Sequence, residues 1–75
     1  MARRLTLKQH FEDAELRVQR AQRRLDRQRE AIAALERAGR DTTKAKRYLR
    51  IFEKALEIHV ADRDRLAKRH ARTPH

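Results

Sequence analysis

The chain has 75 residues, which leaves room for one small domain at most. It contains no cysteine, so disulfides and thiolate metal sites are excluded, and self-association is the default reinforcement for so small a core. The formal net charge of +10 at pH 7 favours acidic partners, such as nucleic acid, an anionic membrane surface or an acidic protein.

No apolar run of the sequence approaches the ~20 residues that a bilayer-spanning helix needs. The basic start of the chain, Met1 to Thr6, is not followed by the apolar segment of a secretory signal. We therefore expect a cytoplasmic protein with no membrane span.

The first predicted element is a long amphipathic helix over about residues 6–38. Steps of four and three residues select a nearly continuous apolar line, with the 3.5-residue repeat of coiled coils. This line consists of Leu7, Phe11, Ala14, Val18, Ala21, Leu25, Gln28, Ile32 and Leu35. Thr6 followed by Gln9 resembles a capping box, which marks the start of this helix.

A turn is predicted at residues 39–41. Gly39 is the only glycine of the chain, and it is suited to the left-handed conformation that ends a helix. Asp41 offers a carboxylate to the free backbone amides at the start of a second helix. A connection this short makes the two helices antiparallel neighbours.

The second helix is predicted over about residues 42–70, followed by a frayed tail at 71–75. Its line at the same spacing consists of Ala45, Leu49, Phe52, Leu56, His59, Arg63, Leu66 and His70. The sequence therefore predicts an all-α fold, an antiparallel two-helix hairpin that resembles a coiled coil. The line of contact between the helices is called the seam below.

Antiparallel pairing of the two lines predicts which residues meet. Predicted neighbours along the seam are Leu35–Ala45, Ile32–Leu49, Gln28–Phe52, Leu25–Leu56, Ala21–His59, Val18–Arg63 and Ala14–Leu66. Beside the seam, opposite charges face each other in Glu36–Lys46, Arg29–Glu53 and Arg17–Asp62. The same register brings His70 close to Phe11.

A second apolar stripe on the second helix lies about 100° from the seam. We expect it to join small residues of the first helix in an exposed patch that pairs two hairpins into a four-helix bundle. The candidate dimer interface consists of Tyr48, Ile51, Ala55, Ile58, Ala31, Ala34 and Ala38. A wide seam within one hairpin and a site for a different protein are the alternatives.

Arginines form a stripe on one face of the first helix. Its members, Arg17, Arg20, Arg24 and Arg27, are spaced to contact several phosphates. No aromatic residue is interleaved with them in the sequence, as base stacking would require. A solvated basic face, non-specific nucleic-acid binding, and contact with an anionic membrane or acidic protein are the three interpretations.

Neither metal binding nor catalysis is predicted. The histidines lack the spacing of metal ligands, and His59 and Gln28 are interpreted as polar seam residues that select the register. The sequence has no cysteine, serine or glycine-rich loop to support catalysis. We expect no cofactor, no small-molecule substrate and no enzymatic activity.

Part of the sequence, from Leu35 to Leu66, carries a recognisable pattern. The matching residues are Gly39, Asp41, Thr42, Phe52, Glu53, His59, Asp62, Arg63, Asp64, Arg65 and Leu66. In these positions the chain resembles a group of small, uncharacterised alphaproteobacterial helical-hairpin proteins, whereas residues 1–30 follow the pattern only loosely. The resemblance implies a bacterial source and a small stand-alone protein.

Taken together, these features favour a non-enzymatic, self-associating helical interaction module. The alternative is a basic accessory protein that binds nucleic-acid phosphates non-specifically through the arginine stripe.

Overall fold

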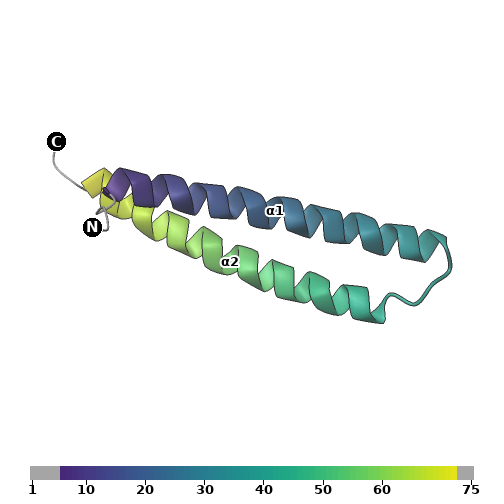
Figure 1. Cartoon of the computed structure of the whole chain (residues 1–75). Helices are drawn as coiled ribbons and strands as arrows, with labels where there is room; N and C mark the ends of the chain where they lie inside the picture. Colours follow the sequence, from purple (N-terminus) through teal and green to yellow (C-terminus); the bar gives the residue numbers. More distant parts are fainter. Residues whose placement is uncertain (1–5, 73–75) are drawn as a thin grey trace, which may run out of the picture.

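A computed structural model describes residues 6–72 as two helices, α1 (Leu7–Arg37) and α2 (Thr43–Arg72). They lie antiparallel, with the connection at one end and the start of α1 beside the end of α2 at the other (Figure 1). The predicted all-α hairpin is confirmed. Helix α2 continues to Arg72 instead of ending near residue 70, because alanine and arginine favour helix. The remainder of the predicted frayed tail, 73–75, lies outside the described residues.

The start of α1 is fixed by reciprocal hydrogen bonds. The backbone amide of Gln9 donates to the Thr6 hydroxyl over 3.1 Å, and the Thr6 amide donates to the Gln9 side-chain oxygen over 2.8 Å. Two amides without partners in the first turn are thereby satisfied, and the predicted capping box is confirmed.

The end of α1 is a Schellman motif centred on Gly39. This residue has a φ of +66° and donates its amide to the Glu36 carbonyl, while the Arg40 amide reaches back to the Leu35 carbonyl. These two bonds satisfy carbonyls that the end of the helix leaves free. The predicted left-handed glycine is confirmed.

The start of α2 depends on Asp41. Its carboxylate accepts hydrogen bonds from the Thr43 hydroxyl over 2.7 Å and from the Thr43 amide over 3.0 Å. The hydroxyl first, and then the amide, lower the pKa of Asp41 below its usual value of 3.8, because both bonds favour the charged carboxylate.

Contacts across the seam bear out the predicted register only in part. The rings of Phe11 and His70 lie stacked at 6.3 Å, as predicted. Gln28, however, donates its side-chain amide to the Ala45 carbonyl over 2.8 Å, and the Phe52 ring lies against Arg24. Gln28 and Phe52 therefore do not pair as predicted, since Ala45 precedes Phe52 by seven residues and Arg24 precedes Gln28 by four.

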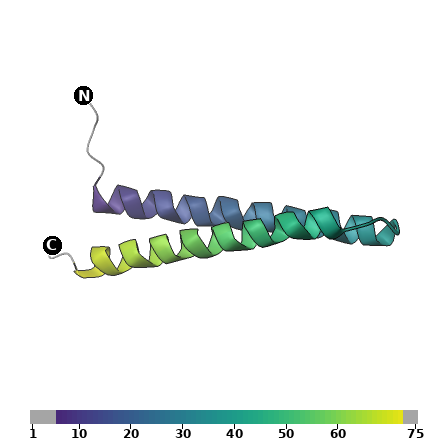
Figure 2. The same cartoon turned by 90° about the horizontal axis from the view of Figure 1, so that it is seen from below.

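The connection is also longer than predicted. Residues 38–42 leave the helical path, where only 39–41 were expected to do so. Helix α1 extends further toward the loop than α2 does, and the connecting chain returns along it before α2 begins (Figures 1 and 2).

The three predicted ion pairs between the helices do not form in the described part of the chain. Arg29 instead pairs with Asp26 of its own helix, and Asp62 pairs with Arg65 one turn away. Within a helix such neighbours are always close, whereas a pair across the seam depends on the register.

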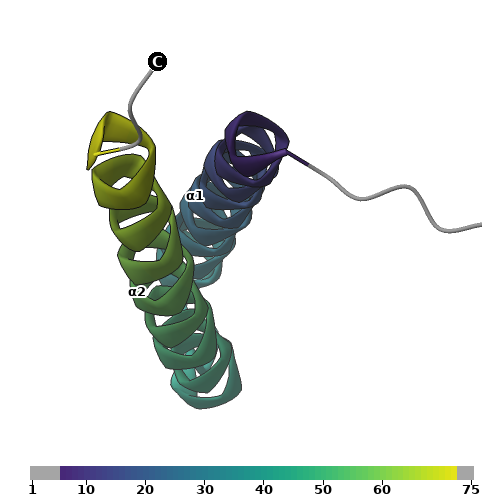
Figure 3. The same cartoon turned by 90° about the vertical axis from the view of Figure 1, so that its left-hand side faces the viewer.

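The helices are inclined to each other instead of running parallel. They converge toward the chain ends in Figure 1 and toward the loop in Figure 2, and the end-on view in Figure 3 shows the same inclination. Within residues 6–71 only Ala14, Leu25 and Ile32 become buried, all on the predicted line of α1. The apolar line of α2 stays only half-buried.

We predict that Gly39→Ala destabilises the hairpin by about 1–2 kcal/mol, because an L-residue resists the left-handed conformation. A Cβ at this position meets nothing within 4 Å, so the cost is conformational and not steric. Asn tolerates this conformation, and Gly39→Asn should cost less. Urea unfolding of the three proteins measures the difference, and equal stabilities would contradict the assignment.

We also predict that the Asp41 cap contributes stability above pH 3.8 that is lost as the pH falls through its lowered pKa. Asp41→Asn keeps an oxygen acceptor but cannot titrate. The melting temperature of the natural chain should exceed that of this variant at pH 7, and the difference should shrink toward pH 2. Asp13→Asn, which removes the same charge far from the loop, serves as the control. A difference independent of pH would contradict the prediction.

Candidate interaction surface

The arginine stripe and the apolar stripe lie on the same side of the hairpin. Arg17 and Arg24 each precede a seam residue of α1 by one position, as Tyr48 and Ala55 do on α2. In an antiparallel pair, residues that precede the seam on both helices lie on one common side. The two sets of residues, considered separately in the sequence, therefore form one surface.

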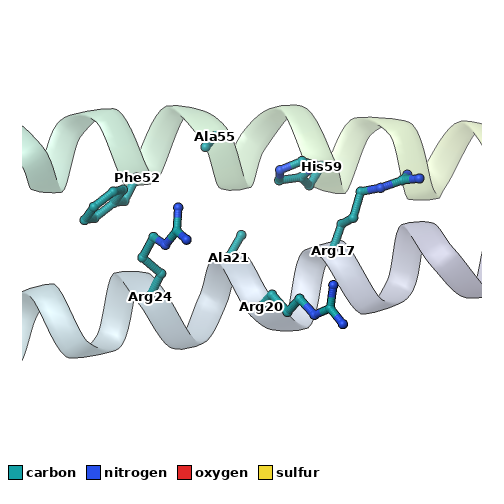
Figure 4. A pocket seen from close by; sticks show the side chains of 7 residues that line it. All are labelled: Arg17, Arg20, Ala21, Arg24, Phe52, Ala55 and His59. Atoms are coloured by element: carbon teal, nitrogen blue, oxygen red, sulfur yellow. The ribbon is translucent and has the colours of Figure 1, made fainter.

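A groove of about 200 Å³ lies between the two helices, over the seam, at the middle of this surface (Figure 4). Helix α1 contributes Arg17, Arg20, Ala21 and Arg24, and α2 contributes Phe52, Ala55 and His59. Figure 4 shows Phe52 with Arg24 at one end of the groove and His59 with Arg17 at the other. The two alanines leave the space between these ends open.

An aromatic ring accompanies the arginines in space, although none does in the sequence. The guanidinium carbon of Arg24 lies over the Phe52 ring, 5.6 Å from its centroid. The Phe52 ring is in turn stacked on Tyr48, with centroids 6.5 Å apart and planes inclined by 27°. Arg24, Phe52 and Tyr48 thus form a continuous series of planar groups across both helices.

The charge of the groove is positive throughout. Its seven lining residues, all within the described chain, include three arginines and no carboxylate. A neighbouring groove toward the chain ends is lined by Arg17, Asp62, Arg65, Leu66 and Arg69. There Arg65 pairs with Asp62, so the only carboxylate of that lining already has a cationic partner.

The fourth arginine of the predicted stripe is placed differently. Arg27 is exposed on α1 but does not line the groove with Arg17, Arg20 and Arg24. The stripe therefore divides into three arginines at the groove and one beyond it, toward the loop.

The large apolar side chains of the predicted dimer interface are exposed. Tyr48, Ile51 and Ile58 are 47%, 57% and 56% exposed, whereas Ala55 is half-buried in the groove. Tyr48 and Ile51 also line a shallow hollow with Lys44 and Arg47 of the same helix. The α1 residues of the predicted interface, Ala31, Ala34 and Ala38, are exposed as well but do not line that hollow.

The histidines of the described chain do not form a metal site. No group of three His, Asp or Glu side chains within residues 6–72 is close enough together to hold a metal ion. His59 lines the groove beside arginines, an environment that suits an anion better than a metal cation.

In the same part of the chain, neither helix is long and apolar enough to cross a bilayer. Comparison with known proteins gave no match to a family model, to a curated protein or to a solved structure. What this surface does is therefore to be inferred from its own chemistry.

Proposed function

We propose that the hairpin is a cytoplasmic, non-enzymatic module that associates with a second copy of itself into a four-helix bundle. The observation that carries this proposal is the exposure of Tyr48, Ile51 and Ile58, each about half exposed, on one face of α2. An apolar face of this kind on a small protein normally marks an interaction surface.

The small core favours a second copy as the occupant. Only three side chains are buried among residues 6–71, and two of them are large. A domain this small needs reinforcement, and the sequence has no cysteine for a disulfide. A second hairpin would cover the half-buried line of α2 and its exposed face together, which extends the seam into a closed core.

We predict that the natural chain sediments as a dimer, at twice its 9.0 kDa mass, and that its melting temperature rises with protein concentration. Ile51→Glu with Ile58→Glu should give a monomer of lower helicity, because four carboxylates cannot be buried at a shared interface. Sedimentation equilibrium and circular dichroism measure both effects.

Leu16→Glu with Ala61→Glu is the matched control. It adds the same charge at exposed positions that face away from the seam. This variant should remain dimeric. A natural chain that stays monomeric at tens of micromolar, or a control that dissociates equally, would contradict the proposal.

A second function, non-specific binding of nucleic-acid phosphates, is supported by the arginine groove. Arg17, Arg20 and Arg24 line one concave site without a carboxylate, in a chain of net charge +10. Guanidinium groups form bidentate hydrogen bonds with phosphate oxygens, and each contact releases counterions from the nucleic acid.

We predict binding to DNA that weakens steeply with salt, with a log–log slope of about −3 for three phosphate contacts on duplex. Arg20→Gln with Arg24→Gln should bring the slope to about −1. Arg23→Gln with Arg50→Gln removes the same charge from exposed positions outside the groove and should change it little. Absence of binding at low salt, or equal effects of the two pairs, would leave the arginines as a solvated face.

A further inference from the structure

We infer that the groove between α1 and α2 binds single-stranded nucleic acid, with phosphates on Arg17, Arg20 and Arg24 and a base stacked on Tyr48, whose ring Phe52 supports. This inference rests on the second function proposed above and deepens it by naming the form of nucleic acid. It arises from a juxtaposition that only the folded hairpin contains, since the arginines belong to α1 and the aromatic rings to α2.

The aromatic rings provide a platform at one end of the groove. Phe52 lies 5.6 Å from the Arg24 guanidinium and is stacked on Tyr48 at 6.5 Å. Both an aromatic ring and a guanidinium plane can stack on a nucleobase. Tyr48, which is 47% exposed, can receive a base without any movement of the helices.

The arginines follow the groove in the direction of the helix axis. From Arg17 to Arg24 they span about 10 Å at 1.5 Å per residue. This distance exceeds the size of a single phosphate, so a polymer with repeated phosphates suits the site better than a free anion. Lys44 and Arg47 precede Tyr48 on α2 and line the hollow beside it. They continue the positive charge past Tyr48, away from the arginine groove.

A single strand suits this site better than a duplex. In a duplex each base face is covered by its neighbours, so aromatic side chains have no free face to contact. The groove of about 200 Å³ is smaller than a typical drug-sized ligand site and admits one base or one sugar-phosphate at a time. A duplex would contact only the arginines at its rim.

The single tyrosine provides a specific probe, because the chain has one tyrosine and no tryptophan. Tyr48 fluorescence therefore reports on this platform alone. At fixed protein concentration and low salt, we expect a thymidine decanucleotide to quench Tyr48 fluorescence. A duplex of the same length and inorganic polyphosphate should bind without quenching, because neither presents an unstacked base.

Variants separate stacking from charge. Phe52→Leu keeps an apolar side chain at the seam, and Tyr48→Leu keeps one on the exposed face of α2. Each should weaken decanucleotide binding about 5- to 150-fold, as for loss of one base stack, and leave polyphosphate binding unchanged. Phe11→Leu alters the ring that faces His70, far from the groove, and is the matched control.

The outcomes distinguish this inference from the function on which it rests. Polyphosphate binding without tyrosine quenching by the decanucleotide, or equal losses in Phe52→Leu and Phe11→Leu, would overturn single-strand stacking and leave phosphate binding intact. Quenching by polyphosphate to the same extent would show that Tyr48 responds to charge and would also overturn it. No binding of any of the three ligands at low salt would overturn both.

Discussion

Two helices packed side by side share a single line of contact, and this constraint determines most of what the hairpin can do. Each helix has one face toward its neighbour, so side chains on either flank stay in reach of water. Ala14, Leu25 and Ile32 are the described side chains that become buried, and the opposing line of α2 remains half-buried. The same geometry leaves Ile51 and Ile58 exposed, although their residue type is typical of a core.

Features that depend on neighbours in the sequence could be predicted from the sequence. Thr6 with Gln9, Gly39 at the end of α1 and Asp41 before α2 all act through hydrogen bonds that span a few residues. Such bonds depend on residue type and local backbone, and both are readable from the chain. The all-α hairpin followed from these signals together with the apolar periodicity.

Features that depend on how far one helix slides along the other were predicted less well. The connection takes up two more residues than expected, and Phe52 faces Arg24 where Gln28 was expected. Periodicity alone allows several such positions, because each shift of a turn keeps apolar residues on the seam. The aromatic platform beside the arginines could not be found without this alignment, whereas the exposure of Ile51 followed from its angle on α2 alone.

The side chain of Gln28 gives a physical basis for the alignment that the structure shows. It is only partly buried, and it donates to the Ala45 carbonyl in the first turn of α2. A shift by one turn would break this bond and leave the amide facing apolar side chains. A polar residue on the seam thus favours one alignment over its neighbours, as buried asparagines do in coiled coils.

The position of Tyr48 has a consequence for how the two proposed activities relate. This ring belongs to the exposed apolar face of α2 and, through Phe52, to the arginine groove. A second hairpin and a nucleic-acid strand would therefore claim the same side chain and exclude one another. Thermodynamic linkage then requires that each weakens the other by the same factor, so an abundant single-stranded nucleic acid would act as an antagonist of assembly.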